Sequence, residues 1–203
     1  MWITPVTLTG PFTRLEPLEV RHAAGLLSAA DPELFRHTPQ NPQEWTAAGF
    51  AEGILKVTGL ADVVAFAIVD SASGAVLGRT TFMDIRAGDR GVEIGRTWIT
   101  RPRHGTHVNP EIKYLMLRHA FEALTPTAIR VQLTTGITNL HSQAAIAKLG
   151  AMREGVLRHN RILPDGVPRD SVFYSILAAE WTNVKDRLEQ RFATRHIARN
   201  ARV

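Results

Sequence analysis

The sequence contains no cysteine among its 203 residues. This absence excludes a disulfide framework, a zinc site built from thiolates and a cysteine nucleophile. A chain of this length buries enough apolar surface to fold without a metal or a disulfide, and we expect no metal. The lack of cysteine is also compatible with a reducing compartment, so we expect a cytoplasmic protein.

Long apolar runs are absent as well. No stretch of about 18 apolar residues occurs, so no segment is expected to cross a membrane. The opening MWITPVTLTGPF lacks a basic patch followed by an apolar run, unlike a signal peptide. The length favours one domain over residues 1–203, with a helical C-terminal extension from about residue 180.

Acidic residues are too few to balance the basic ones, and the net charge is +5. Part of the excess lies near the C-terminus, at Arg187, Arg191, Arg195, Arg199 and Arg202. Nucleic-acid binding is one interpretation. The segment has little aromatic interleaving and contains Asp and Glu, which favours a solvated helix face with a basic tail. We therefore expect no nucleic-acid partner, although a mildly basic surface would suit an anionic cofactor or an acidic protein substrate.

The first half of the chain combines short helical patterns with longer apolar runs. Apolar spacing predicts helices at residues 20–27, 32–35 and 45–55, the last beginning from Asn41-Pro42-Gln43-Glu44. Alternating or buried runs predict strands at residues 12–18, 61–69, 75–85 and 92–99. Turn-forming residues separate the last three strands, so we expect them to form an antiparallel meander.

In the second half, helices separate the strands. Helices are predicted at residues 111–124, 139–149, where Gly150 ends the helix, and 180–192. Strands are predicted at residues 129–134, 152–159 and 171–177, with a turn at Pro164-Asp165-Gly166. This order predicts an α+β fold with a mixed, mainly antiparallel central sheet and helices on both faces.

Two loop-to-helix units carry the functional signal. In the first, the strand EIGRTWI leads through the loop TRPRHGTHVNP into the helix EIKYLMLRHAFE. A helix N-terminus entered in this way offers unpaired N–H groups and a positive dipole end, which suit a pyrophosphate. In the second, Asn139-Leu140-His141-Ser142 opens a helix. The simpler alternatives are that Gly105 only makes a turn and that Asn139 or Ser142 only caps its helix.

Together with the preceding meander, these units resemble the GNAT acetyltransferase superfamily. The resemblance is nearest to the Rim-type branch of ribosomal-protein N-terminal acetyltransferases. It covers nearly the whole chain and is carried by TRLEPL, EIGRTWI, NLHSQAAIAKLGAMREGVLR and LPDGVPRDSVFYSI. It implies the acyl-CoA N-acyltransferase fold and acetyl-CoA as cosubstrate. The implied acceptor is a primary amine, either a protein N-terminus or a small molecule, and a homodimer is allowed for.

The resemblance also implies a set of cofactor contacts. The family's loop pattern is Gln or Arg, two residues, Gly, one residue, then Gly or Ala. It falls on His104, His107 and Asn109, so this chain departs at each position and keeps Gly105 one step inside. A backbone N–H near Ile99 or Thr100 is expected to polarise the thioester carbonyl. The implied contacts are Ile99, Thr100, Arg103, His104, Gly105, Thr106, His107, Val108, Asn109 and, for the pantetheine arm, Asn139.

For the chemistry, the resemblance implies direct attack of the amine on the thioester between the splayed fourth and fifth strands. Ser142 matches the Rim-type position suggested as the acid that protonates the leaving thiolate. Glu93 is a candidate base or water-holding carboxylate, or else an edge-facing or solvated side chain. Tyr174 is a further candidate acid, or else a packing residue.

A different class of function remains open on the sequence alone. The altered loop, with His104 and His107, would also fit a non-catalytic GNAT-like module that binds CoA or a partner without turnover.

Overall fold

A computed structural model describes residues 1–35, 42, 44–163 and 165–200, with side chains described as far as residue 192. Within this part of the chain, eight strands form one sheet in the order β1-β2-β3-β4-β5-β6-β8-β7. The strands are β1 (Leu8–Thr9), β2 (Thr13–Pro17), β3 (Val64–Asp70), β4 (Val76–Arg86), β5 (Gly91–Ile99), β6 (Arg130–Gly136), β7 (Met152–Ile162) and β8 (Pro168–Leu177).

Most neighbouring strands of the sheet are antiparallel. The meander expected from residues 61–99 is present as β3, β4 and β5. β5 and β6 instead pair in parallel, because α3 carries the chain back across the sheet between them. The predicted α+β class, with a mixed and mainly antiparallel sheet, is therefore confirmed.

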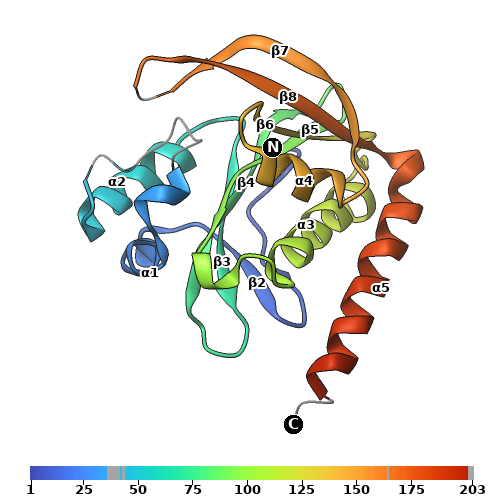
Figure 1. Cartoon of the computed structure of the whole chain (residues 1–203), viewed down its shortest axis with the longest axis horizontal. Coiled ribbons are helices and arrows are strands. Elements are labelled where there is room, and N and C mark those ends of the chain that lie inside the picture. The colour runs from blue at the N-terminus through green and yellow to red at the C-terminus, as the bar shows by residue number, and fades with distance from the viewer. Residues whose placement is uncertain (36–41, 43, 164, 201–203) are drawn as a thin grey trace.

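Helices cover both faces of the sheet (Figure 1). The α-helices are α1 (Ala23–Ala29), α2 (Ala47–Thr58), α3 (Val108–Arg118), α4 (Leu140–Ala147) and α5 (Trp181–Asn200). One apolar core lies between the sheet and α1 and α2, and a larger one lies between the sheet and α3, α4 and α5. None of the described helices is long and apolar enough to cross a membrane.

α3 begins earlier than its apolar spacing predicts. It starts at Val108 instead of Glu111, with Pro110 in its first turn, where a missing N–H leaves no hydrogen bond unmade. Val108 and Asn109 therefore belong to the helix and not to the loop before it. After Arg118 the chain continues as one turn of π-helix, from His119 to Ala123.

Two further boundaries differ from those predicted. α2 is capped by Thr46, whose Oγ1 accepts a hydrogen bond from the Gly49 N–H at 3.0 Å, and not by the Asn41–Glu44 segment. Asn41, Gln43 and the predicted turn residue Pro164 lie outside the described residues. α5 runs to Asn200, beyond the predicted end at residue 192, and Trp181, Val184 and Leu188 bury one face of its first half in the larger core.

Candidate active site

The parallel pairing of β5 and β6 ends after three residue pairs, and the two strands then separate. Paired residues are Gly91 with Arg130, Val92 with Val131, and Glu93 with Gln132. Beyond them β5 runs on to Ile99 and β6 to Gly136, and these two described segments do not pair with each other. The result is a V-shaped opening at the carboxyl ends of two parallel strands, the place where open α/β sheets commonly bind ligands.

A β-bulge in β5 faces this opening. Trp98 pairs with Arg79 and Gly95 pairs with Thr81, so β5 holds one more residue than β4 over this stretch. Arg96 accommodates the extra residue with φ of 50°. A bulge bends its strand and leaves backbone groups without ladder partners. In the sequence its only trace is Gly95, because glycine inside a strand often marks a bulge.

The backbone groups of Ile99 and Thr100, at the end of β5, point in opposite directions. The Thr100 N–H donates to Leu77 O on β4 at 2.7 Å, so of the two expected N–H groups this one is not free to polarise a thioester carbonyl. The backbone N–H and C=O groups of adjacent strand residues point to opposite sides of the strand. Those of Thr100 point toward β4, so those of Ile99 point toward the opening. There Ile99 O accepts a hydrogen bond from His104 Nε2 at 2.8 Å. Because a carbonyl can only accept, Nε2 carries the ring proton.

The loop from Arg103 to His107 and the start of α3 are held by local hydrogen bonds. Thr106 Oγ1 donates to Arg103 O at 2.7 Å and lies 3.3 Å from the Val108 N–H. Gly105 has φ of 70°, and a Cβ built on it would meet nothing within 4 Å. The left-handed backbone conformation, and not crowding, is therefore the reason for glycine at this position.

The two histidines that replace family residues both make ring contacts. His104 stacks on His141 of α4, with ring centroids 5.9 Å apart and planes 23° from parallel. The loop after β5 and the helix after β6 therefore meet beside the opening between these two strands. His107 packs against Phe12, with ring centroids 4.2 Å apart, so the start of α3 is attached to the N-terminal segment.

Asn139 is a helix cap. Its Oδ1 accepts a hydrogen bond from the Ser142 N–H at 3.0 Å, as expected for a cap, and this bond does not test the expected contact with the pantetheine arm. The Ser142 side chain is half-buried in the first turn of α4. Its neighbour Gln143 donates to Ile137 O at 2.7 Å and accepts a long, 3.4 Å hydrogen bond from the Tyr174 hydroxyl. The fold thus brings Ser142 and the buried Tyr174 to the same end of α4.

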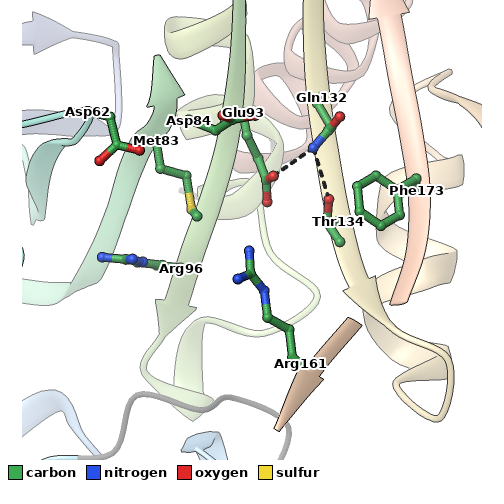
Figure 2. Close-up of a pocket in the computed structure, with 9 residues that line it drawn as sticks. All are labelled: Asp62, Met83, Asp84, Glu93, Arg96, Gln132, Thr134, Arg161 and Phe173. Atoms are coloured by element: carbon green, nitrogen blue, oxygen red, sulfur yellow. Dashed lines mark hydrogen bonds between the residues drawn. The ribbon is translucent and has the colours of Figure 1, made fainter. Parts of the chain in front are cut away.

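Glu93 lies where the two strands begin to separate. It is 8% exposed, so it is neither edge-facing nor solvated. Its Oε2 accepts a hydrogen bond from Gln132 Nε2 at 2.8 Å (Figure 2). Burial raises the pKa of the Glu93 carboxyl, while this hydrogen bond and the charge of Arg161 oppose the rise. A carboxyl with a raised pKa beside a cavity is suited to exchanging protons.

The cavity beside Glu93 has a volume of about 350 Å³. Its lining includes Met83, Arg96, Gln132, Thr134 and Arg161, so both strands and the β7 hairpin contribute to it (Figure 2). Sequence reasoning did not identify Arg96, Gln132 or Arg161, and charged residues in alternating strands give no local sign that they converge. Within the described residues, no group of three or more His, Asp or Glu side chains could hold a metal ion.

Lys113 is another residue that the sequence analysis missed. It is 6% exposed in α3, and its Nζ donates to Thr97 Oγ1 on β5 at 2.7 Å. Its position in α3 beside Ile112, among residues that are mostly apolar, was the one available signal. The lysine lies against the same strand that edges the opening.

Comparison with known proteins agrees with this geometry. A family model described as the acetyltransferase (GNAT) domain matches residues 13–152. A crystal structure from T. thermophilus, provisionally described as an acetyltransferase, is 41% identical with a TM-score of 0.87, and the match covers 94% of this chain and 99% of that one. Mycobacterium smegmatis RimJ, solved in complex with CoA-disulfide, is 23% identical with a TM-score of 0.78, over 92% of this chain and 95% of that one.

Among curated proteins, the chain is 28% identical over 112 residues to YdaF of Bacillus subtilis (strain 168), provisionally named a ribosomal N-acetyltransferase. That match covers 55% of this chain and spans 59% of the length of YdaF. The name of YdaF agrees with the resemblance to the Rim-type branch, and the match to the family model favours an enzyme over a non-catalytic module. The chain therefore belongs to the GNAT acetyltransferase family and is an acyltransferase.

Proposed function

We propose that this enzyme transfers an acetyl group from acetyl-CoA to a primary amine, and that a protein N-terminus is its acceptor. The observation that carries the proposal is the separation of β5 from β6 beyond Glu93 and Gln132, with a bulge facing the opening. The names of YdaF and RimJ support a protein acceptor, and the CoA derivative bound to RimJ supports the cosubstrate.

In this proposal acetyl-CoA enters the opening in the following orientation. The pantetheine arm would lie between the strands alongside Ile99, whose backbone groups are on the open side. The pyrophosphate would lie at residues 103–109, where the first turn of α3 offers N–H groups and the positive end of its dipole. Asn139 would border the arm from α4, which the stacking of His104 on His141 places opposite the loop.

The reaction then requires two proton movements. The neutral amine nitrogen attacks the thioester carbon, the carbon–sulfur bond breaks, and the nitrogen loses a proton. In this proposal Glu93 takes that proton, directly or through water, and Ser142 donates a hydrogen bond or proton to the thiolate. Tyr174, beyond Gln143, is the second candidate acid. Holding both reactants in line can lower the barrier by roughly 7–11 kcal/mol.

The direct test is release of CoA thiol with a panel of peptides that have free or blocked N-termini, with mass spectrometry of the products. We expect one acetyl group per thiol on free N-termini only. Binding of acetyl-CoA without thiol release across the peptide panel and a small-amine panel would contradict the proposed activity. Acetylation confined to small amines would contradict the proposed acceptor.

The cosubstrate site has its own test. Gly105→Val should raise the Michaelis constant for acetyl-CoA, because valine disfavours the left-handed conformation that the loop adopts. Gly88→Val, in the turn before β5, is a matched control that also adds a Cβ to open space. His107→Gly should bind at least as well as the wild type, since it restores the family residue. Unchanged kinetics in Gly105→Val would argue against this placement of the pyrophosphate.

A further inference from the structure

Lys113 holds a buried amino group whose hydrogen-bonding capacity is mostly unused. Its side chain is almost fully enclosed, and an ammonium carries three N–H donors. Among the side chains that the structure describes, Thr97 Oγ1 is the one hydrogen-bond acceptor of Nζ, and no ion pair includes Lys113. Buried polar groups in folded proteins are normally satisfied, so the remaining donors point to an acceptor on a bound molecule.

Thr97 fixes this amino group at the bulge of β5. Arg96 and Thr97 together face the single residue Thr80 of β4. Thr97 Oγ1 lies 2.7 Å from Thr80 Oγ1, which in turn lies 3.5 Å from Met116 Sδ. Because the ammonium can only donate, Thr97 accepts from Lys113 and its own hydroxyl proton can bond Thr80. The chain of hydrogen bonds holds Nζ against the segment of β5 that has separated from β6.

Lys113 and Glu93 lie on opposite faces of β5. Ile94 packs in the larger core, and Lys113 reaches Thr97 from α3 on that same side. Glu93 precedes Ile94 and therefore points to the other face, where it lines the cavity. Burial lowers the pKa of Lys113 to about 7, and the charge of Glu93 opposes the fall. A group that lies in the opening at this level would have a carboxyl on one side and an amino group on the other.

The order of residues along β5 indicates which part of acetyl-CoA lies beside Lys113. In the placement proposed above, the pyrophosphate lies at residues 103–109 and the pantetheine arm passes Ile99. Further along the strand toward Glu93, the arm next reaches Thr97 and Lys113. The thioester is at the end of the arm and must lie within reach of an amine that faces Glu93, so its carbonyl comes to the level of Lys113.

We propose that Lys113 is a catalytic residue, which donates a hydrogen bond from Nζ to the thioester carbonyl oxygen of acetyl-CoA. This inference rests on the proposed acetyl transfer and adds a side-chain donor to the backbone N–H of Ile99. The carbonyl oxygen gains negative charge as the amine attacks, and a fixed donor in a site that excludes water stabilises that charge. Lys113 keeps its proton, and no bond to Nζ forms or breaks. Thr97 is a positioning residue for it.

Infrared spectroscopy tests this contact without any acceptor. Isotope-edited difference spectra follow the carbonyl band of bound acetyl-CoA that is labelled at its thioester carbonyl. We expect the band at lower wavenumber in the wild type than in Lys113→Met, because a hydrogen bond to the oxygen weakens the C=O bond. Lys148→Met, at an exposed position of the chain, is the control and should leave the band unchanged.

Calorimetry and kinetics separate a catalytic role from a structural one. CoA lacks the thioester carbonyl, so it should bind Lys113→Met as tightly as the wild type. The kcat of Lys113→Met should fall by about 10²–10³, as on removal of other donors to a developing oxyanion. Thr97→Val should lower kcat by a smaller factor, and Thr97→Ser, which keeps the hydroxyl, should restore it. If Lys113→Met does not fold, the band position and kcat of the two Thr97 variants decide the test.

Failure of this inference is distinguishable from failure of the proposed function. An unchanged carbonyl band or a wild-type kcat in Lys113→Met overturns the inference while acetyl transfer stands. Equal loss of affinity for CoA and acetyl-CoA with unchanged kcat also overturns it, because Lys113 would then contact another part of the arm. Absence of acetyl-CoA binding, or of thiol release with every amine, in the wild type instead counts against the proposed function.

Discussion

Lys113 is a lysine held inside the larger apolar core, where an ammonium group is poorly solvated. Its neighbours in α3, Ile112 and Met116, are fully buried. Burial lowers the pKa of Lys113 to about 7, although the charge of Glu93 acts in the opposite direction. The folded protein therefore releases this proton near neutrality, whereas the unfolded chain holds it up to about pH 10.4.

This difference makes stability depend on pH in a definite direction. Between pH 7 and about pH 10.4 the unfolded chain binds more protons than the folded one, so this residue makes the free energy of unfolding rise with pH. Lys113→Met, which lacks the charge, should be more stable than the wild type at pH 6, and the difference should shrink toward pH 10. Urea titrations at pH 6, 8 and 10 measure it, with Lys148→Met at an exposed position as control. A difference that stays constant with pH would refute the assignment.

Glu93 and Gln132 form a buried hydrogen-bonded pair whose role can be tested by pH dependence. If Glu93 accepts the amine proton, kcat/KM should rise as pH passes the raised pKa of its carboxyl, and Glu93→Gln should lose that limb and about 10²–10⁴ in rate. Gln132→Met removes the hydrogen bond that favours the carboxylate, so it should move the limb to higher pH. A pH–rate profile for each variant tests this. An unchanged limb in Glu93→Gln would mean that another group is the base.

At the scale of elements, the first turn of α4 combines a structural and a chemical role. Asn139 occupies the cap position and bonds the Ser142 N–H, so the backbone that carries the candidate acid depends on this side chain. The turn is also connected to the loop after β5 through His141 and His104. A change at the cap should therefore affect both the stability of the helix and the placement of acetyl-CoA.

The two residues of this turn should respond differently to substitution. Asn139→Ala should lower the free energy of unfolding by about 0.5–2 kcal/mol and raise the Michaelis constant for acetyl-CoA, whereas Asn139→Ser should keep most of the stability. Ser142→Ala should change stability little. It should reduce turnover by a factor near the low end of about 10²–10⁴, because a thiolate leaves without full protonation. Thermal unfolding and steady-state kinetics separate these effects. Normal turnover in Ser142→Ala would direct attention to Tyr174.

At the scale of the whole molecule, the two halves of the sheet are joined by a short pairing between β5 and β6. These strands share three parallel residue pairs, while the β7–β8 and β6–β8 pairings on one side and the β3–β4 and β4–β5 pairings on the other are longer. A ligand that lies between the strands would contact both halves of the sheet. Bound acetyl-CoA should therefore raise the free energy of unfolding of the whole domain.

The expected stabilisation can be stated in advance. At about 100 times its dissociation constant, acetyl-CoA should add roughly 2.7 kcal/mol to the free energy of unfolding. For a chain of this size that corresponds to an increase in melting temperature of roughly 5–11 °C. Differential scanning calorimetry measures it, and Gly105→Val should require more ligand for the same increase than Gly88→Val. No increase at saturating acetyl-CoA would exclude this opening as the binding site.

The elements themselves could be predicted from the sequence because they depend on residues close together in the chain. The buried run in residues 61–69 is a strand for this reason, and the apolar spacing around Ile112 and Met116 is a helix. Asn139 was recognised as a cap candidate, since a cap acts within three residues. The motifs around residues 93–110 and 139–150, in this order, sufficed to indicate the family.

The candidate site was decided by the tertiary structure. Glu93 meets Gln132 across 39 positions of the sequence, and Arg161 reaches the same cavity only because β8 and β7 fold back beside β6. The bulge at Arg96 depends on the register of β5 against β4, and Gly95 alone does not determine that register. Local propensity acts over a few residues, whereas strand register and the burial of a charge are set by partners distant in the chain. For that reason the sequence alone determined the fold class and the family, while the packed sheet determined which side chains share the active-site cavity.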